Sequence, residues 1–318
     1  MGSKKNGVIL MNMGGPDTLN DVQPFLYNLF SDREIIRLGP FFLQKFLAFV
    51  ISRRRAPKSR AIYGKIGGGS PLKNLTLRQA NALENALAPE GEWPVTFAMR
   101  YWPPHANTAI QLLLQQGVTR ITALTLYPHY SKATTGSSVR DLHRHFKAVD
   151  ADIDLTIISS YPTQPSYIKA LVENINNGLK EFDKDKVEIV YSAHSLPISF
   201  IEEGDPYVDH IKETINAIEE QTGHRGRLCY QSRSGPVEWL SPSTPEMLNI
   251  LAKEGCKNIL MVPISFVSDH VETLYEIAML YRKQAEDLGM RLLPCESLNC
   301  HPLFIQGLRD LVLHQEVQ

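Results

Sequence analysis

Short apolar runs alternate with helical repeats along almost the whole of this 318-residue chain. The runs are rich in β-branched residues, and between them apolar residues recur every three or four positions, as at Ile168, Leu171 and Ile175. Continuous apolar runs are typical of buried parallel strands, and the longer spacing is typical of the amphipathic helices that connect them. The pattern therefore predicts an α/β protein. Its expected strands are residues 8–11, 95–99, 121–126, 155–159, 187–191, 228–231, 259–263 and 291–293.

The eight expected strands fall into two groups of four, separated by the proline-containing segment 161–165. Such a segment between periodic runs indicates a connector. We therefore expect two Rossmann-like lobes, each a four-stranded parallel sheet flanked by helices. The expected lobes are residues 1–160 and 161–300. They are followed by the segment 301–318, whose helix from Pro302 to about Leu313 could belong to either lobe.

The charge of the chain is nearly balanced, with 33 basic and 34 acidic residues. No global field therefore attracts nucleic acid, and we expect no nucleic-acid partner. The cysteines Cys229, Cys256, Cys295 and Cys300 have none of the paired spacings of zinc or redox sites. The first residues lead into a strand without the apolar stretch of a signal peptide. We expect a cytoplasmic protein.

One phenylalanine-rich segment bears on membrane contact. Residues 41–51 (FFLQKFLAFVI) are followed by Arg53, Arg54 and Arg55. The segment is shorter than the roughly 18 apolar residues that a spanning helix needs. An apolar segment with a basic flank could lie in a membrane interface, its cations facing anionic head groups. The alternative is a buried helix with a solvent-exposed end.

Ionisable side chains gather where two expected strands end. His194 follows the fifth strand, and Asp269, His270, Glu272 and Glu276 follow the seventh. Ligands bind open α/β sheets at the carboxyl ends of their strands, so we expect these side chains to share a cleft. There they could relay protons or hand on a divalent metal ion. The alternatives are a structural histidine and a glutamate pair on a solvent-exposed helix face.

Other motifs exclude function classes. The chain has no G-x-S-x-G segment, so a serine hydrolase of the α/β type is a poor interpretation. The segment 67–71 (GGGSP) lacks the ending of a phosphate loop and the strand-helix setting of a dinucleotide site. It could bind a carboxylate through its amides and the Ser70 hydroxyl, or it could be a plain turn between helices.

Taken in chain order, these segments resemble the ferrochelatase family, whose members insert ferrous iron into a porphyrin. The resemblance spans nearly the whole chain. Its matching segments are 12–16 (NMGGP), 66–71 (IGGGSP), 127–131 (YPHYS), 134–138 (TTGSS), 192–197 (SAHSLP), 231–233 (QSR), 235–236 (GP), 239–240 (WL) and 266–274 (FVSDHVETL).

The resemblance implies a porphyrin held between two Rossmann-like lobes and a C-terminal helix that returns to the first lobe. It implies that His194 and Glu272 are catalytic and that His194, Glu272, His270 and Glu276 handle the metal ion. The residues that would bind porphyrin are Met13 beneath the ring, Arg55, Tyr63 and Ser70 at the propionates, and Arg100, Tyr127, Trp239 and Phe266 along the pocket. The phenylalanine-rich segment would belong to a lip that meets the membrane, so the resemblance favours peripheral membrane contact.

The implied reaction is the last step of heme biosynthesis, catalysed by a lyase that takes protoporphyrin IX and ferrous iron as substrates. Members that use coproporphyrin tend to carry tyrosine where this chain has Met13, which favours protoporphyrin. The remaining alternatives are a coproporphyrin ferrochelatase, another tetrapyrrole metal chelatase and a non-catalytic tetrapyrrole carrier. A carrier needs neither a base nor a facing carboxylate, so the presence of both His194 and Glu272 argues against it.

We expect no tightly bound cofactor. Animal members carry a cysteine-rich C-terminal extension that ligates an iron–sulfur cluster, whereas this sequence ends at Gln318 and has Lys132 where such members place a ligand cysteine. A third acidic position, one turn beyond Glu276, is Leu280 here, so any carboxylate relay is shorter. The unperturbed pKa of histidine, about 6.5, would let His194 accept pyrrole protons near neutral pH.

Overall fold

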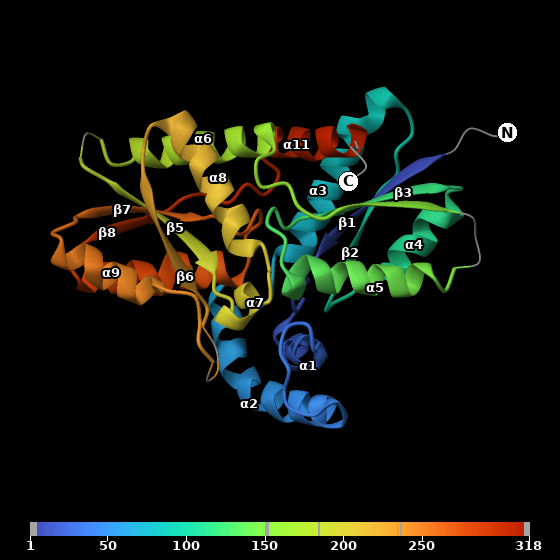
Figure 1. The fold of residues 1–318 in the computed structure, drawn as a ribbon, viewed down its shortest axis with the longest axis horizontal. Coiled ribbons are helices and arrows are strands. Elements are labelled where there is room, and N and C mark those ends of the chain that lie inside the picture. Colours follow the sequence, from blue (N-terminus) through green and yellow to red (C-terminus); the bar gives the residue numbers. More distant parts are fainter. Residues whose placement is uncertain (1–4, 150–152, 184, 234, 236, 315–318) are drawn as a thin grey trace. The chain divides into compact units, whose positions relative to one another are not determined.

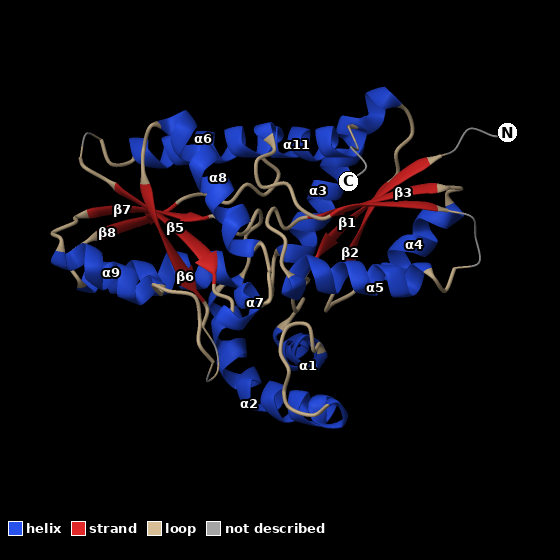
Figure 2. Ribbon diagram, viewed as in Figure 1, coloured by secondary structure: helices blue, strands red, loops and turns tan. Residues whose placement is uncertain are grey.

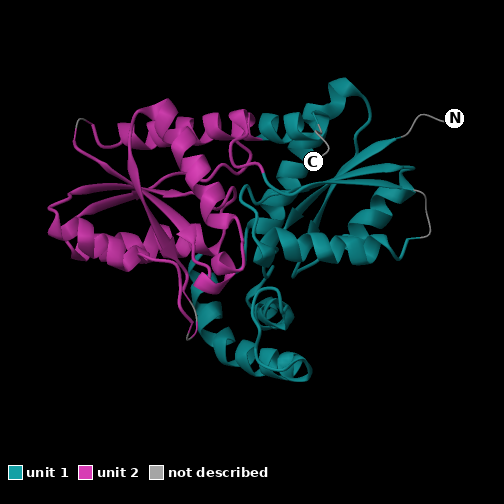
Figure 3. Ribbon diagram, viewed as in Figure 1, with its two compact units in different colours: residues 1–160, 305–318 teal, residues 161–304 magenta. Residues whose placement is uncertain are grey.

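The computed structural model describes residues 5–149, 153–183, 185–233, 235 and 237–314. The first four residues, used above to exclude a signal peptide, and Pro236 of a matching segment lie outside the described residues. The chain forms two compact units (Figure 3). Unit 1 comprises residues 1–160 and 305–318, and unit 2 comprises residues 161–304.

Unit 1 contains a parallel sheet in the order β2-β1-β3-β4 (Figure 1). Its strands are β1 (Asn6–Asn12), β2 (Val95–Met99), β3 (Arg120–Thr125) and β4 (Asp154–Ile158). Its α-helices are α1 (Val22–Ser31), α2 (Gln44–Lys65), α3 (Leu72–Leu87), α4 (Ala106–Gln115), α5 (Ser137–Phe146) and most of α11 (Pro302–Leu313). Shorter helical segments are η1 (Leu19–Asp21), η2 (Phe41–Leu43), η3 (Ala88–Glu90) and η4 (Lys132–Gly136).

The central strand β1 is buried on both faces. Ile9 and Met11 pack in one core cluster with Ile110 and Leu113 of α4. Val8 and Leu10 are fully buried and, because side chains alternate along a strand, point to the opposite face. A strand covered on both faces needs apolar residues at successive positions, which is why β1 reads as a continuous apolar run.

Unit 2 repeats this topology with the order β6-β5-β7-β8, again all parallel (Figure 2). Its strands are β5 (Glu188–His194), β6 (Gly226–Gln231), β7 (Asn258–Pro263) and β8 (Arg291–Pro294). Its helices are α6 (Pro165–Lys180), α7 (Ile198–Glu202), α8 (Tyr207–Thr222), α9 (Thr244–Lys253), the π-helix η5 (Glu272–Tyr281) and α10 (Arg282–Asp287).

The predicted α/β class, with two four-stranded parallel sheets flanked by helices, is confirmed. The main difference lies at the end of β5, which we expected near Tyr191 and which continues to His194. The polar residue Ser192 interrupts the apolar run, but its hydroxyl donates to Gln231 Oε1 at 2.7 Å and both side chains are buried. A satisfied polar group is tolerated inside a sheet, so the strand goes on.

In each sheet, the strand order indicates where a ligand would bind. In unit 1 the chain continues from β1 to a strand at one edge of the sheet and from β3 to a strand at the opposite edge. In unit 2 it does the same from β5 and β7. Open α/β sheets bind ligands beyond the carboxyl ends of the two strands at such a switch point. His194 ends β5, and the segment that leads to Glu272 follows β7. Unit 2 therefore presents both side chains at its switch point.

The phenylalanine-rich segment is not a buried helix. Phe41 and Phe42 of η2 are 81% and 79% exposed, and Phe46 and Phe49 of α2 are 64% and 46% exposed, whereas Ala48 of α2 is buried. Within the described part of the chain, every helix is too short or too polar to cross a bilayer.

Candidate active site

His194 and Glu272 meet at the end of the second sheet. His194 Nδ1 lies 2.9 Å from Glu272 Oε2. A carboxylate only accepts hydrogen bonds, so Nδ1 carries the hydrogen, and in the neutral imidazole Nε2 keeps its lone pair. The side chain of Glu272 is 11% exposed and that of His194 is 38% exposed. The imidazole is therefore oriented by a buried carboxylate while part of its ring remains accessible.

The backbone of His194 is held from two directions. Its amide donates to Ser265 Oγ at 3.0 Å, and its carbonyl accepts a hydrogen bond from the Tyr207 hydroxyl, also at 3.0 Å. Ser265 follows β7 and Tyr207 opens α8, and both are buried. The ring position is thus set by three different elements and not by the strand alone.

Gln231 completes the carboxylate's environment. Its Nε2 donates to Glu272 Oε2 at 2.9 Å, the same oxygen that His194 contacts. Gln231 ends β6 and pairs in register with His194 of β5. The sheet therefore carries both donors to Glu272 on adjacent strands.

The ring of Phe266 lies close to both histidines. Its centroid is 6.3 Å from that of His194 in an edge-on arrangement and 4.0 Å from that of His270. His270 Nδ1 lies 3.1 Å from the carbonyl oxygen of Ser268, so Nδ1 is the donor there. The other nitrogen, Nε2, is 3.8 Å from Glu272 Oε1. One oxygen of Glu272 is thus hydrogen-bonded to His194, and the other lies 3.8 Å from His270 without a hydrogen bond.

The charges of this group shift its pKa values. Burial lowers the pKa of His194, but the adjacent Glu272 and the charge of Glu276 outweigh burial and raise it above its ordinary value. Burial raises the pKa of Glu272, but His194 and His270 outweigh it and hold the pKa well below its usual range. Burial and the charge of Glu272 raise the pKa of Glu276. Glu272 therefore stays ionised, while Glu276 holds a proton more readily than an ordinary glutamate.

The helix that carries both glutamates differs from our expectation. The sequence predicts an α-helix with the glutamate pair on the face opposite its apolar stripe, and that face could be either a cleft wall or exposed to solvent. The helix η5 is a π-helix, whose wider turns bring residues four to five apart onto one side. Glu272 is buried, and Glu276 Oε2 accepts from Ser232 Oγ at 2.7 Å and from the Tyr281 hydroxyl at 3.2 Å. The interpretation as a solvent-exposed pair is therefore wrong.

Trp239 lies beside the segment that follows His194. Its backbone forms an antiparallel bridge with Pro197, and the amide of Leu240 donates to the carbonyl of Leu196 at 3.0 Å. Trp239 is half-buried. Unit 2 thus brings together the predicted site residues His194, Phe266, His270, Glu272 and Glu276. Trp239 is placed only by its backbone, beside the segment that follows His194.

The predicted porphyrin-binding residues of unit 1 lie at several places. Met13 follows β1 and Tyr127 follows β3, so both stand at the switch point of their sheet. Tyr63 is buried near the end of α2, whereas Arg55 is exposed on the same helix, with its guanidinium 5.3 Å from the ring centroid of Phe30. Their predicted contacts with porphyrin stay predictions.

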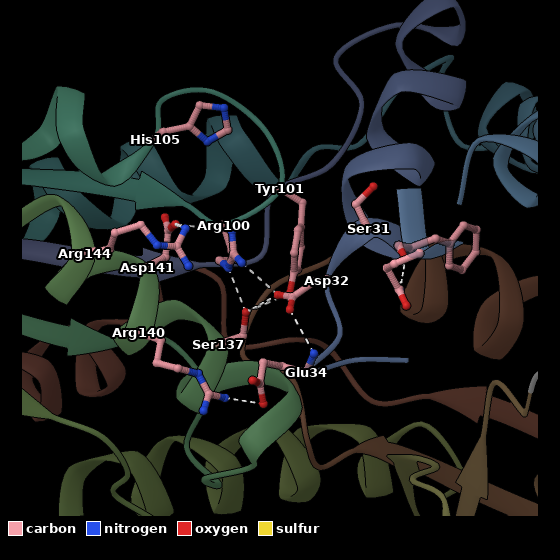
Figure 4. Close-up of polar contacts among 12 residues, drawn as sticks. Ser31, Asp32, Glu34, Arg100, Tyr101, His105, Ser137, Arg140, Asp141 and Arg144 are labelled. Carbon is pink, nitrogen blue, oxygen red and sulfur yellow. Dashed lines mark hydrogen bonds and ion pairs between the residues drawn. The ribbon is translucent and has the colours of Figure 1, made fainter. Parts of the chain in front are cut away.

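Arg100 belongs to a buried polar cluster in unit 1. Figure 4 shows Arg100, Tyr101 and Ser137 converging on Asp32. The distances to Asp32 Oδ2 are 2.8 Å from Arg100 Nη2, 2.8 Å from the Tyr101 hydroxyl and 2.5 Å from Ser137 Oγ. Arg100 Nη1 is also 3.5 Å from Asp141 Oδ1. Its guanidinium is therefore held by two carboxylates, which favours a structural role at this position.

The glycine segment connects α2 and α3, as the plain-turn interpretation expected. Gly67 and Gly68 have φ of +105° and +92°, which favour glycine. A Cβ on Gly69 would lie 2.2 Å from the carbonyl oxygen of Asp17, and the Ser70 amide donates to the carbonyl of Pro16 at 2.8 Å. The segment is packed closely against the loop after β1.

Sequence reasoning missed the polar residues that surround the His194–Glu272 pair. Ser192, Tyr207, Gln231 and Ser265 are buried and hydrogen-bonded around His194 and Glu272. In the sequence, Gln231 stands out only as part of the segment 231–233 that matches the ferrochelatase family. Its position at the end of an expected strand, like that of His194, is the one feature that could have indicated its role.

Among the described residues, no group of three or more histidine, cysteine, aspartate or glutamate side chains is arranged to hold a metal ion. The metal-handling role expected of His194, Glu272, His270 and Glu276 stays a prediction.

Known proteins resemble this chain along its whole length. A sequence model of the ferrochelatase family matches residues 5–316. A ferrochelatase of Desulfotalea psychrophila is 64% identical over 311 residues, covering 98% of this chain and 97% of that protein. A ferrochelatase of Geotalea uraniireducens is 50% identical over 312 residues, covering 97% of each. The solved structure of SirB from Bacillus subtilis with Fe3+ covers 97% of this chain and 94% of its own at 11% identity, with a TM-score of 0.56, and so shares the fold.

Proposed function

This chain belongs to the ferrochelatase family, and we propose that it inserts ferrous iron into protoporphyrin IX to form heme at the site built around His194 and Glu272. The observation that carries the proposal is the His194–Glu272 pair, in which a buried carboxylate fixes the imidazole and leaves Nε2 as its proton acceptor. The reaction needs such an acceptor, because both pyrrole N–H groups must lose their protons before the metal ion is bound by four nitrogens.

His194 acts as the general base. Its Nε2 accepts a pyrrole proton as the N–H bond breaks, and the electron pair stays on the pyrrole nitrogen, which then binds the iron. The imidazolium formed in this step is stabilised by Glu272, whose carboxylate lies 2.9 Å from Nδ1. The pair thus places a negative charge where positive charge develops.

Glu276 takes the proton onward, after which Nε2 of His194 accepts the proton of the second pyrrole N–H group. Its raised pKa makes it a better proton acceptor than Glu272, whose pKa is held low. Ser232 and Tyr281 both donate to Glu276 and keep its carboxyl group in place. The side chain at the third position, Leu280, is 38% exposed and cannot bind a proton, so the relay along this helix does not extend beyond Glu276.

Phe266 and Trp239 supply apolar surface for the porphyrin. Phe266 lies against the rings of both His194 and His270, so a macrocycle that reaches His194 would also meet this ring. A ring held against apolar side chains is more easily bound in a distorted form that presents its nitrogens to the metal ion. Met13 favours protoporphyrin over coproporphyrin, because family members that use coproporphyrin tend to carry tyrosine at this position.

We further propose that the phenylalanine-rich segment contacts a membrane surface. Four phenylalanines of η2 and α2 are largely exposed, which is unusual for large apolar side chains, and Arg53, Arg54 and Arg55 follow them in exposed positions. Apolar residues with a basic flank suit the interface of an anionic bilayer. Peripheral attachment would let the enzyme take up an apolar porphyrin from the membrane.

Metallation assays with the purified protein test the function. Protoporphyrin IX or coproporphyrin is mixed with ferrous iron under exclusion of oxygen, or with zinc ion, and the change of the porphyrin absorption bands is followed. We expect protoporphyrin to be metallated faster than in buffer. Faster metallation of coproporphyrin would overturn the substrate assignment, and porphyrin binding without any rate enhancement would indicate a carrier.

A further inference from the structure

Asp269 and Asn299 form a reciprocal pair of hydrogen bonds within unit 2. The backbone amide of Asp269 donates to Asn299 Oδ1 at 2.9 Å, and Asn299 Nδ2 donates to Asp269 Oδ2, also at 2.9 Å. The residues are 30 positions apart: Asp269 precedes the π-helix η5, and Asn299 lies in the segment between β8 and α11. Two bonds in opposite directions fix both the distance and the orientation of the two segments.

The pair belongs to a small network around the start of the π-helix. Thr273 Oγ1 donates to Asp269 Oδ1 at 3.1 Å and accepts from the amide of His270 at 3.1 Å. The amide of Asn299 donates to the carbonyl of Val267 at 2.7 Å. These hydrogen bonds hold the segment 267–273, which contains His270 and Glu272, at both of its ends. The network therefore determines where the first turn of the π-helix begins.

Asn299 adopts a backbone conformation that most residues other than glycine rarely take. Its φ is +46°, in the left-handed region that costs most residues about 1 kcal/mol or more. Asparagine tolerates this region better than most residues, and glycine tolerates it best. Such a conformation persists where surrounding contacts over-determine it, and the bonds to Asp269 and Val267 do so here.

The Asp269–Asn299 pair lies on a different side of the π-helix η5 from His194 and Glu272. Asp269, Thr273 and Asn299 line a cavity of about 350 Å3 together with Ile277 and Glu296. Among the described residues, His194 and Glu272 are not part of this lining. An effect of Asn299 on metallation must then pass through the backbone of the helix start.

We propose that Asn299 is a positioning residue for metallation: its bonds to Asp269 fix the start of the π-helix and thereby hold Glu272 against His194. The inference rests on the proposed function. The physical reason is the sensitivity of proton transfer to distance, since a displacement of about 1 Å at a catalytic group can cost about 100-fold in rate. Glu272 stands three residues after Asp269, within the first turn that the pair holds.

Asn299→Gly separates positioning from folding. Glycine accepts the positive φ without strain, so the variant loses both side-chain bonds while the backbone conformation becomes easier to adopt. We expect kcat to fall about tenfold or more, the porphyrin Kd to stay within about twofold, and the melting temperature to stay near that of the parent protein. A kcat within twofold of the parent value would overturn the proposal.

A reciprocal exchange tests the pair directly. In Asn299→Asp alone, two carboxylates face each other, so kcat should fall at least as far as in Asn299→Gly. Adding Asp269→Asn restores a donor on the opposite side, keeps an acceptor for the amide of residue 269 and keeps an oxygen for Thr273. The double variant should recover most of the lost kcat. A double variant no better than Asn299→Asp would contradict the inference.

Asn174→Asp is the matched control. Asn174 Nδ2 donates to the carbonyl of Glu296 at 3.0 Å and so holds the same segment from α6. A merely structural role of Asn299 predicts equal losses in Asn174→Asp and Asn299→Asp. We expect the control to lower the melting temperature and leave kcat within about twofold to threefold.

The NMR signal of the His194 Nδ1 proton provides a readout without turnover. A hydrogen bond to a carboxylate shifts this signal downfield, and in Asn299→Gly it should move upfield or broaden. An unchanged signal in that variant overturns the positioning role, whatever the activity. If the parent protein shows no metallation but the signal still depends on Asn299, the proposed function fails and the positioning role of Asn299 stands.

Discussion

Gln231 and His194 donate to the same oxygen of Glu272, each at 2.9 Å. Gln231 is the last residue of β6 and His194 the last residue of β5, and the two are paired in register. The spacing of two adjacent strands thereby sets the distance between the two donors, and the carboxylate is held by the rigid edge of a sheet. A side chain held in this way needs little reorganisation when His194 takes up a proton.

Gln231→Leu should lower metallation without preventing folding. The substitution removes one donor from the ionised Glu272 and leaves the Ser192 hydroxyl without its acceptor. A hydrogen bond to a charged group contributes about 1.5–3 kcal/mol, so we expect kcat to fall about 10- to 100-fold. The porphyrin Kd, measured by fluorescence quenching, should change little. Gln221→Leu, on the exposed end of α8, serves as the control, and equal losses in the two variants would contradict the role of Gln231.

His194→Ala should abolish metallation while porphyrin binding largely remains, because the variant removes the proton acceptor and leaves Phe266 and Trp239 in place. Stopped-flow absorption separates binding from metallation. Added imidazole should restore part of the rate, since a small base can enter the space left by the side chain. Turnover near that of the parent protein would show that His194 is not the base.

The pH dependence follows from the neighbours of His194. Its pKa is raised, so the imidazole becomes the neutral base only above the ordinary value of about 6.5, and kcat should rise with pH through that region. Glu272→Gln removes the charge that raises this pKa while burial, which lowers it, remains. The pKa of His194, followed by NMR titration, should therefore fall in the variant. An unchanged pKa would mean that Glu272 does not control the imidazole.

The sequence predicts the sheets, and it predicts that His194 and Glu272 share a cleft, for one physical reason. Buried parallel strands are continuous apolar runs, and the carboxyl ends of such strands share one edge, so residues 78 positions apart could be placed together. The π-helix was not predictable, because Glu272 and Glu276 have the spacing of an ordinary α-helix. Gln231 was missed because a glutamine that does not titrate gives no signal until its partner is known.

Arg100 shows a different limit of sequence reasoning. The family resemblance implies porphyrin binding for Arg100, and its guanidinium is paired with the carboxylates of Asp32 and Asp141. Charges paired inside a fold cannot be read from their sequence positions, since the partners are 68 and 41 residues away. Only the packing of α1 and α5 against the strand end reveals them.

Arg100→Met should destabilise unit 1. Removing one partner of a buried ion pair leaves an uncompensated charge and costs about 3 kcal/mol, and here both Asp32 and Asp141 lose their cation. Urea unfolding measures the loss. Arg144→Met is the control: Arg144 also contacts Asp141, but its side chain is 68% exposed, so the change should stay within about 0.5 kcal/mol. Equal stabilities of the two variants would contradict the structural role, and an altered porphyrin Kd in Arg100→Met would support the predicted substrate contact.

Membrane contact should depend on the exposed phenylalanines of η2. Burying one such side chain contributes about 1.5–3 kcal/mol, so replacing both Phe41 and Phe42 with Ser should weaken binding to phosphatidylglycerol vesicles about tenfold or more. Leu112→Ser, which changes an exposed apolar residue of α4, should leave vesicle binding unchanged. Vesicle sedimentation at two salt concentrations separates two contributions to the vesicle affinity. Salt screens the contribution of the charges of Arg53, Arg54 and Arg55 and leaves that of the apolar side chains. If the double variant binds as tightly as the parent protein, the segment does not insert, and its phenylalanines serve another contact.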